Sequence, residues 1–340
     1  MLAARLVEAG KPLEIQEVPT PEVVGDQVLV KVAGAGVCHS DLHILDMAAG
    51  LDLPVTLGHE NTGHVARLGP DASGLELEQP VAVYGGWGCG TCRLCQGGEE
   101  QLCDTSKWVG LGSAGGYAEF LLVPHSRYLI PLGGLDPVES APLVDAALTP
   151  YRAIKSAQPK LGAGSTAVTL GVGGLGQFAV QLLRAVTEAR IIAVDVDETR
   201  LKRATEYGAD ITVSSGPETA STIMEHTDGE GAQVVFDMVG SDETLALAAQ
   251  LVAKGGRIAV IGLAGGTLAY SALGLPWEAE VTTSAWGTRD ELAEVLELAR
   301  EGRIESRVQT YQLQQINDAL SDLRSGKVAG RAVVTPNRER

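Results

Sequence analysis

The chain has 340 residues, 45% of them hydrophobic, which is enough for two domains with sizeable cores. Its formal net charge of -17 argues against nucleic acids and anionic membrane surfaces as partners, because like charges repel. The segment MLAARLVEAGK lacks the long apolar stretch of a signal peptide, and no apolar run is long enough to span a bilayer. We therefore expect a cytoplasmic protein, whose reduced cysteines more often bind metal than form disulfides.

The first part of the chain, to about residue 145, reads as short β-strands interrupted by Gly and Pro, as in QVLVKVAGAGV and QPVAVYGG. It contains two candidate zinc ligands, Cys38 in GVCHSDLH and His59 in LGHE. The local sequence alone does not establish that either residue binds zinc. Cys38 also suits a small buried thiol, and His59 also suits a histidine satisfied within a core.

Four of the five cysteines lie in one short loop, GWGCGTCRLCQGGEEQLC. Their spacing is C-x2-C-x2-C-x7-C, which suits a closed tetrahedral zinc site with a structural role. An iron–sulfur cluster is the main alternative interpretation, and cysteines that bind no metal are the other. A zinc ribbon that reads nucleic acid is disfavoured, since the only basic residue within the loop is Arg93. The proposed ligands are Cys89, Cys92, Cys95 and Cys103.

From Ser165 the pattern changes to short apolar strands that alternate with amphipathic helical segments. STAVTLG, RIIAVDV, AQVVFDMVG and RIAVIGL are the expected strands, with helical stretches such as QFAVQLLRAVTEA between them. This alternation predicts a parallel sheet covered by helices on both faces.

The turn after the first of these strands, TLGVGGLGQF, has the G-x-G-x-x-G spacing of a dinucleotide-binding loop. The next strand ends at Asp195, nineteen residues after the last of these glycines. An aspartate there accepts hydrogen bonds from the ribose hydroxyls and repels a 2′-phosphate, which favours NAD over NADP. The alternative is a glycine turn without a ligand, with Asp195 as a helix N-terminal acid. The cofactor-binding candidates in the loop are Gly171, Gly173, Gly174 and Gly176.

Two helical segments, DELAEVLELAREGR and INDALSDLRSG, and a strand, GRAVVTP, follow Trp286. Sequence pattern alone does not say to which domain they belong.

Taken in order and spacing, GVCHSDLH, LGHE, GCGTCRLC and GVGGLG resemble the zinc-dependent medium-chain alcohol dehydrogenases, over essentially the whole chain. The resemblance implies an α/β protein with a GroES-like, β-rich catalytic domain and a Rossmann domain with a doubly wound parallel sheet. It places the catalytic domain at 1–146, the NAD-binding domain at 147–284 and a return to the catalytic domain at 285–340.

By the same resemblance, Cys38 and His59 bind a catalytic zinc together with Asp145, where many members have cysteine and some have aspartate. Three protein ligands leave a fourth position for water or alcohol. Glu60 resembles a carboxylate that approaches the zinc during ligand exchange, and it suits a salt bridge equally well. Asp41 resembles the acid that orients the ligand histidine through its other ring nitrogen, and is otherwise a turn residue.

The resemblance also implies a proton path. Zinc lowers the pKa of the alcohol, Ser40 takes the proton, and His43 passes it to solvent. Without the resemblance, Ser40 would read as a capping hydroxyl and His43 as a surface residue. Thr149 is expected near the nicotinamide. His39 and Arg331 are expected near the pyrophosphate, although either also suits an ordinary surface cation.

Three residues are candidates for the substrate pocket. Trp87 directly precedes the cysteine loop, and Trp286 lies where the chain leaves the Rossmann domain. Ala285 is small and leaves room for a bulky substituent. Tryptophans more often belong to a core, but aromatic residues make up only 4% of this chain.

The sequence therefore predicts an NAD-dependent, zinc-dependent enzyme that interconverts secondary alcohols and ketones, with two zinc ions per chain. The nearest alternative is a dehydrogenase of the same family for a polyol, threonine or an aromatic primary alcohol. A zinc-free quinone reductase and a non-catalytic sensor of NAD and zinc are less favoured. We expect small-molecule substrates, and we expect the chain to form a homotetramer or else a dimer.

Overall fold

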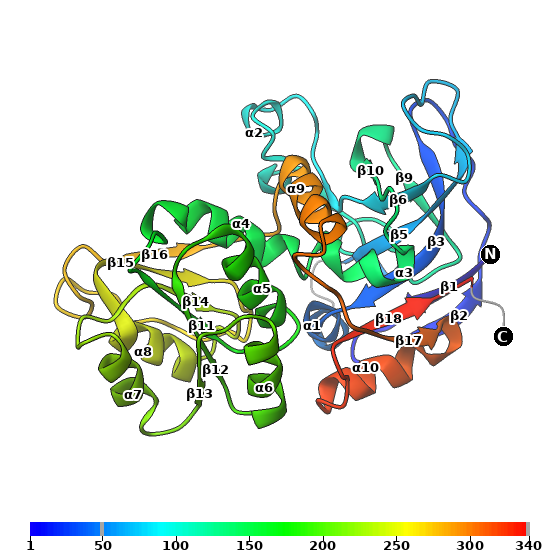
Figure 1. The fold of residues 1–340 in the computed structure, drawn as a ribbon. Coiled ribbons are helices and arrows are strands. Elements are labelled where there is room, and N and C mark those ends of the chain that lie inside the picture. Colours follow the sequence, from blue (N-terminus) through cyan, green and yellow to red (C-terminus); the bar gives the residue numbers. More distant parts are fainter. Residues whose placement is uncertain (48–50, 338–340) are drawn as a thin grey trace. The chain divides into compact units, whose positions relative to one another are not determined.

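The structure is a computed structural model that describes residues 1–47 and 51–337. The chain divides into two compact units (Figure 1). Unit 1 comprises Met1–Leu148 and Gly287–Arg340, and unit 2 comprises Thr149–Trp286. The helices and strand that follow Trp286 thus belong to the same unit as the N-terminal region, a point that the local pattern left open.

Unit 1 is built on a largely antiparallel sheet whose strands follow the order β10-β6-β5-β3-β18-β17, with β9 also paired to β3. β3 lies at its centre, and its side chains are buried on both faces except near Lys31. β18 pairs antiparallel with β3, so the C-terminal segment completes the sheet begun by the N-terminal one. The strands are β3 (Val28–Val37), β5 (Glu60–Leu68), β6 (Pro80–Val83), β9 (Phe120–Val123), β10 (Leu129–Pro131), β17 (Val308–Gln312) and β18 (Arg331–Thr335).

Smaller elements surround this sheet. β1 (Leu2–Leu6), β2 (Glu14–Glu17) and β4 (Val55–Thr56) form a three-stranded sheet, and β7 (Gly86–Trp87) pairs with β8 (Lys107–Trp108) beside the cysteine loop. The helices of unit 1 are α1 (His39–Met47), α2 (Arg93–Gln96), α3 (Pro137–Ser140), α9 (Arg289–Arg300) and α10 (Ile316–Arg324).

Unit 2 contains a six-stranded parallel sheet with the order β13-β12-β11-β14-β15-β16, as the alternating pattern predicted. Apolar side chains such as Val168, Ile192 and Val235 form its core. The order reverses at β11, and ligands of open α/β sheets bind at such a reversal, beyond the carboxyl ends of the strands. The strands are β11 (Thr166–Leu170), β12 (Arg190–Asp195), β13 (Ile211–Ser214), β14 (Ala232–Asp237), β15 (Val252–Val260) and β16 (Glu280–Thr283).

The helices that accompany this sheet begin with recognisable capping residues. Asp197 accepts hydrogen bonds from two backbone amides at the start of α6, and Ser241 and Thr244 form a capping box at the start of α8. The helices are α4 (Leu148–Ala157), α5 (Gly176–Val186), α6 (Glu198–Glu206), α7 (Thr219–His226) and α8 (Asp242–Leu251).

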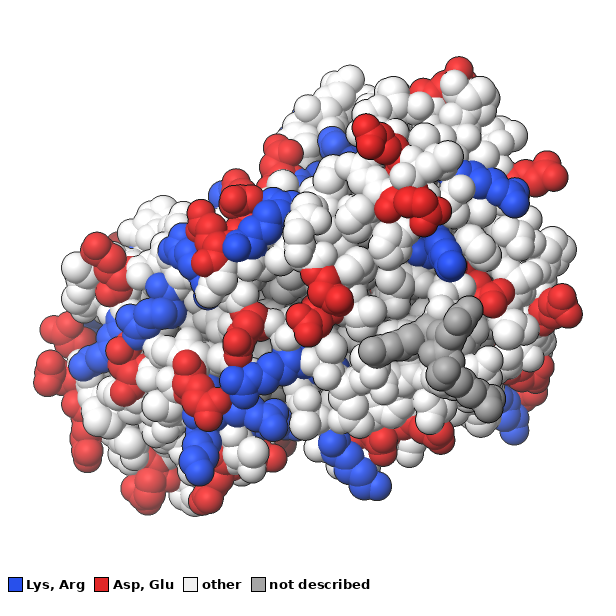
Figure 2. All heavy atoms as spheres, turned by 45° about the vertical axis from the view of Figure 1, so that its right-hand side comes forward, with Lys and Arg blue, Asp and Glu red and all other residues white. Residues whose placement is uncertain are grey.

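Within the described residues, no helix combines the length and the hydrophobicity needed to cross a bilayer. On the face shown in Figure 2, Asp and Glu side chains are interspersed with Lys and Arg. On this face, neither acidic nor basic side chains gather in one large patch.

Candidate metal and dinucleotide sites

A cluster of possible metal ligands forms where β3 and β5 meet in unit 1. Cys38 directly follows β3 and His59 directly precedes β5, and the antiparallel register pairs Gly36 with Glu60. Asp145 follows a short 3-10 turn, Ala141–Val144. One ligand atom from each of Cys38, His59, Glu60 and Asp145 lies within 4.8 Å of the others. The paired strands β3 and β5, together with the turn at Ala141–Val144, thus bring together the residues that the sequence analysis proposed.

His59 is held between two carboxylates. Its Nδ1 lies 3.4 Å from Asp41 Oδ1, and its Nε2 lies 3.4 Å from Asp145 Oδ2. The contact with Asp41 is close enough for electrostatic attraction but is not an aligned hydrogen bond. Burial lowers the pKa of His59, yet the charge of Asp41 and the contact with Asp145 outweigh it and hold that pKa well above its usual value. The cluster therefore favours a positive charge, which a metal cation satisfies as well as a proton does.

Asp41 itself is fixed by other contacts. Its Oδ2 accepts hydrogen bonds from the Cys38 backbone amide at 2.9 Å and from the Tyr117 hydroxyl at 2.7 Å. All three side chains are buried. Asp41 is thus placed to orient His59, as the resemblance implied, and Tyr117 is an additional support that sequence spacing did not reveal.

Glu60 is fully buried and pairs with Arg331 of β18, whose Nη2 donates to Glu60 Oε1. Burial raises the pKa of Glu60 to about 7, although the charge of Arg331 opposes that shift. A Cβ on Gly36 would lie 1.9 Å from Glu60 Oε2, so only glycine leaves room for this carboxylate. The structure thus supplies the salt bridge that the sequence analysis allowed for Glu60. Arg331 is 2% exposed, so its reading as an ordinary surface cation is wrong. A contact with pyrophosphate stays a prediction.

Two further catalytic candidates, Ser40 and His43, and the cofactor-binding candidate His39 lie on α1. Ser40 is half-buried, with its Oγ 3.5 Å from Cys38 Sγ, whereas His39 and His43 are exposed to solvent. Ser40 therefore lies beside the metal-ligand cluster, and the roles of His39 and His43 stay predictions.

The three pocket candidates, and Thr149, the candidate for a nicotinamide contact, lie in different surroundings. Trp87 is buried, donates from Nε1 to the Tyr84 carbonyl oxygen at 2.7 Å, and packs 6.3 Å from the Tyr128 ring centroid. Thr149, Ala285 and Trp286 belong to unit 2. Thr149 and Trp286 are buried and Ala285 is exposed, and the backbone of Trp286 has a φ of 50°.

The four cysteines of the loop also gather their sulfurs. Each offers one sulfur, and these atoms lie within 4.8 Å of one another. Cys89 Sγ is 3.9 Å from Cys95 Sγ, and Cys92 Sγ is 3.8 Å from Cys103 Sγ. Sulfurs that bind one tetrahedral zinc at about 2.3 Å lie about 3.8 Å apart, so these separations fit a single zinc ion.

Backbone amides of the loop point at the sulfurs. The amides of Cys92 and Cys95 donate to Cys89 Sγ and Cys92 Sγ, each at 3.4 Å, and the amide of Cys89 donates to Cys103 Sγ at 3.5 Å. Hydrogen bonds from Thr91 and the Cys92 amide lower the pKa of Cys89 to about 5, whereas burial raises that of Cys95 to about 12. The donor set and the amide contacts suit thiolates that share a cation.

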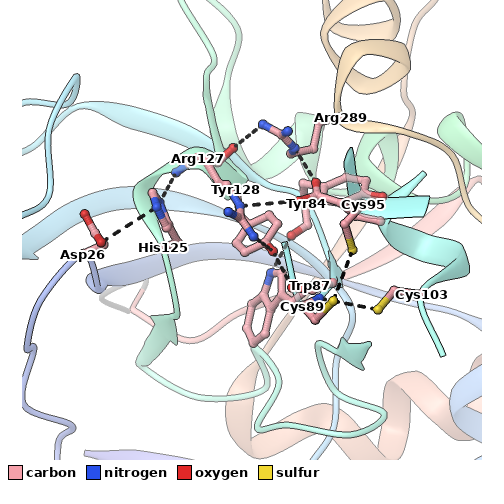
Figure 3. Close-up of polar contacts among 12 residues, drawn as sticks. Asp26, Tyr84, Trp87, Cys89, Cys95, Cys103, His125, Arg127, Tyr128 and Arg289 are labelled. Carbon is pink, nitrogen blue, oxygen red and sulfur yellow. Dashed lines mark hydrogen bonds and ion pairs between the residues drawn. The ribbon is translucent and has the colours of Figure 1, made fainter. Parts of the chain in front are cut away.

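A network of charged and aromatic side chains lies beside this loop (Figure 3). Arg127 Nη2 donates to the Tyr128 hydroxyl, which donates to the Gly88 carbonyl oxygen at 3.0 Å. Glu100 is 2% exposed and pairs with both Arg127 and Arg289. Sequence reasoning missed these residues, because no spacing links positions 100, 127 and 289.

The glycine-rich turn of unit 2 joins β11 to α5. Gly171 has a φ of 86°, and a Cβ on Gly176 would lie 1.9 Å from the Gly171 carbonyl oxygen. At Gly173 the nearest atom to an added Cβ is Arg200 Nη1 at 3.9 Å, which leaves space above the backbone. Gly174 lies within the same turn. These features suit close approach of a pyrophosphate to the amides at the start of α5.

Asp195 ends β12, the neighbour of β11, and is 5% exposed. Its Oδ2 accepts from the Val172 amide at 2.6 Å, and its Oδ1 accepts from the Asp197 amide at 2.9 Å. Arg200 Nη1 lies 3.7 Å from the same Oδ1. The carboxylate is therefore fixed against the glycine turn, at the edge where the sequence analysis placed the ribose.

Comparisons with known proteins identify relatives over the whole chain. Residues 25–134 match the family model described as alcohol dehydrogenase GroES-like domain, and residues 174–301 match that of zinc-binding dehydrogenase. An NAD-dependent alcohol dehydrogenase from Sulfurisphaera tokodaii is 39% identical over 99% of this chain and 100% of its own. A D-arabinose 1-dehydrogenase (NADP(+)) from Saccharolobus solfataricus is 36% identical over 98% of this chain and 97% of its own.

A comparison with solved structures identifies the same family. The crystal structure of the alcohol dehydrogenase from the archaeon Aeropyrum pernix superposes with a TM-score of 0.93 at 39% identity, covering 99% of this chain and 100% of that one. The predicted fold class, a GroES-like domain with a Rossmann domain, is thereby confirmed.

Proposed function

This chain belongs to the family of zinc-dependent medium-chain alcohol dehydrogenases, and we propose that it oxidises alcohols, secondary alcohols in particular, reversibly to ketones or aldehydes with NAD. The observation that carries this proposal is the buried cluster of Cys38, His59 and Asp145, which combines sulfur, nitrogen and oxygen donors. Three such ligands suit a catalytic zinc, which keeps one position for substrate.

In the proposed mechanism, Cys38, His59 and Asp145 hold the catalytic zinc, and Asp41 and Tyr117 keep His59 oriented. When bound there, zinc would supply Lewis-acid chemistry that lowers the pKa of the alcohol hydroxyl, and NAD would accept the hydride. Ser40 takes the hydroxyl proton, which His43 passes to solvent. Thr149, His39 and Arg331 are proposed to contact the cofactor, and Glu60 to approach the zinc during ligand exchange.

The cysteine loop is proposed to hold a second zinc with a structural role, giving two zinc ions per chain. Its four sulfurs leave no ligand position for a substrate. Trp87, Trp286 and Ala285 remain the proposed pocket residues, and a cytoplasmic location remains a prediction. A metal analysis that gives one zinc per chain, or iron, would contradict the two-zinc proposal.

The direct test is NADH formation by the purified protein with secondary alcohols, primary alcohols, polyols, sugars and threonine, and with NADP in parallel. Rapid turnover of secondary alcohols with NAD is the expected result. The D-arabinose 1-dehydrogenase relative supports a sugar or polyol as the second candidate substrate class. A zinc-loaded protein that turns over none of these compounds would favour the sensor alternative.

Cofactor preference provides a sharper prediction at Asp195. We expect Asp195→Ser to lower kcat/KM for NAD by about 10- to 100-fold, because it removes charge-assisted hydrogen bonds to the ribose. It also removes the charge that repels a 2′-phosphate, beside the cationic Arg200. The ratio of kcat/KM for NADP to that for NAD should therefore rise.

The matched control is Asp197→Asn, which removes a carboxylate two residues further on and retains a side-chain oxygen for capping α6. We expect this control to leave the cofactor ratio within about twofold of the wild type, because Asp197 contacts Asp195 through its backbone amide, which the substitution keeps. Equal ratios in both variants would contradict the proposed role of Asp195.

The proposed homotetramer, or dimer, has a candidate interface on unit 2. β16 is an edge strand of its sheet among the described residues, and edge strands pair readily with other chains. Nearby in sequence, Tyr270, Leu273 and Trp277 are 72%, 86% and 63% exposed. Large apolar side chains gathered in one segment indicate a surface that another chain covers.

We expect Leu273→Glu to reduce the mass measured by light scattering after size-exclusion chromatography, because it places a charge in this apolar segment. Leu77→Glu is the matched control, since Leu77 is an exposed leucine of unit 1. An unchanged mass for Leu273→Glu, or an equal decrease in both variants, would argue against this interface.

A further inference from the structure

A zinc ion bound by four thiolates has a problem of charge. Four thiolates and one Zn²⁺ carry a net charge of about -2, and a charged group placed away from water is costly unless it is compensated. Two of the four ligands, Cys95 and Cys103, are buried. The amide contacts of the loop offset part of this charge, and a nearby cation would offset more.

We infer that Arg127 is the positioning cation of the four-cysteine site, held against the loop by Tyr128 and Glu100 so that its charge stabilises the bound metal. This inference rests on the proposed structural zinc and goes beyond its ligands.

The guanidinium of Arg127 lies directly against the loop. A Cβ on Gly90 would be 3.1 Å from Arg127 Nη2 and 3.2 Å from Nη1. Gly90 directly follows the ligand Cys89, and its φ is 78°. Glycine at this position therefore permits both the left-handed turn and the close approach of the cation.

Two contacts with Tyr128 hold the guanidinium in place. Arg127 Cζ lies 4.7 Å from the Tyr128 ring centroid, and Arg127 Nη2 donates to the Tyr128 hydroxyl at 2.6 Å. The same hydroxyl donates to the carbonyl oxygen of Gly88, the residue before Cys89. Tyr128 thus links the arginine to the backbone on one side of the loop, while Gly90 meets it on the other.

Glu100 anchors this arrangement from within. Its Oε1 lies 3.4 Å from Arg127 Nε, and its Oε2 lies 2.5 Å from Nε of Arg289, which begins α9. One buried carboxylate between two guanidinium groups leaves one positive charge in excess. That excess lies beside a site of opposite sign, so the network is electrostatically matched to a tetrathiolate.

The other charges around Arg127 are compatible with this role. His125 Nδ1 accepts from the Arg127 amide at 3.1 Å, and its Nε2 lies 3.8 Å from Asp26 Oδ2. Burial lowers the pKa of Arg127, but hydrogen bonding to Tyr128 and the charges of Glu100 and Cys95 outweigh it and raise that pKa. By contrast, Arg93 lies within the loop itself and is exposed, where solvent screens its charge.

The test measures how firmly the site retains metal. Wild-type enzyme is reconstituted with Cd²⁺, and its thiolate-to-metal ultraviolet absorption is followed after addition of excess EDTA. Four thiolates in the loop against one in the other cluster make this signal report chiefly on the four-cysteine site. The variants are Arg127→Gln, Arg127→Lys and the matched control Arg93→Gln.

We expect Arg127→Gln to release Cd²⁺ about tenfold faster than wild type, as is typical when a group that supports metal ligands is removed. Arg127→Lys should restore most of the retention because it keeps the charge, and Arg93→Gln should stay within about twofold of wild type. Equal rates in Arg127→Gln and Arg93→Gln would overturn the inference. Equal rates in Arg127→Gln and Arg127→Lys would overturn the role of charge.

Tyr128→Phe keeps the test decisive if Arg127→Gln does not fold, since it removes only the hydroxyl that joins Arg127 to Gly88. Release about threefold faster than wild type is expected, in line with one lost hydrogen bond, and a wild-type rate would overturn the inference. A wild-type protein without four-thiolate absorption would instead contradict the proposed structural zinc site.

Discussion

Replacing His59 by glutamine is expected to lower the kcat for alcohol oxidation by at least about a thousand-fold, because a catalytic metal contributes several kcal/mol to the transition state. Glutamine has a similar reach but lacks the imidazole nitrogen that would bind zinc, and it cannot hold a positive charge between Asp41 and Asp145. The measurement is steady-state NADH formation with the best secondary alcohol, together with the zinc content per chain, which should fall by one ion.

His64→Gln is the matched control for this experiment. His64 lies in β5, five residues after His59, and is partly exposed outside the ligand cluster. We expect it to retain turnover within about threefold of wild type, as is usual for a partly exposed substitution away from a site. Wild-type turnover in His59→Gln, with one zinc fewer per chain, would show that the reaction does not use this cluster.

The effect of His59 depends on a support that spans the sheet. The pairing of β3 with β5 sets Cys38 beside His59, and Asp41 ties the Cys38 amide to the histidine ring. β18 pairs with the other edge of β3 and carries Arg331, which contacts Glu60. Cys38 and His59 are therefore positioned by β3 and β5 before any metal binds, and β18 from the end of the chain supports the neighbouring Glu60.

The sequence predicted best those features that short segments determine. The dinucleotide turn needs glycine at 171 for a positive φ and at 176 for close packing. Both residues belong to one strand–turn–helix unit, so the local sequence is enough to predict them. The four-cysteine loop is similarly local. The parallel sheet of unit 2 followed from regular alternation of apolar strands and helices, which the structure confirms.

Contacts that depend on long-range pairing were harder to foresee. Cys38, His59 and Asp145 were grouped by resemblance and not by spacing, because only the β3–β5 register and the turn at 141–144 bring them together. Arg331 suited a surface cation in sequence, but it lies on β18, an internal strand between β3 and β17, and is buried against Glu60. Glu100, Arg127 and Arg289 meet only after three separate segments have packed.

Replacing Cys95 by serine is expected to lower the thermal stability of the protein far more than its catalytic turnover. Structural zinc contributes folding energy directly, so losing one buried ligand should cost about 3 kcal/mol or more and lower the Tm by about 6–12 °C. Gln96→Ser is the matched control, because it introduces serine at the next position of the same short helix, where the side chain is exposed. Differential scanning calorimetry and zinc content are the measurements, and a Tm equal to that of the control would contradict the structural role.

Together, the two substitutions separate the two proposed metal sites by opposite outcomes. His59→Gln should lose turnover while its Tm changes little. Cys95→Ser should have a lower Tm, but its turnover well below that Tm should stay within about threefold of wild type. The reason is that the Cys95 sulfur lies outside the ligand cluster of Cys38. The reason is chemical, since three ligands of mixed type leave a position for substrate and four thiolates do not. Loss of turnover in folded Cys95→Ser protein that retains its other zinc would show that the two sites are coupled.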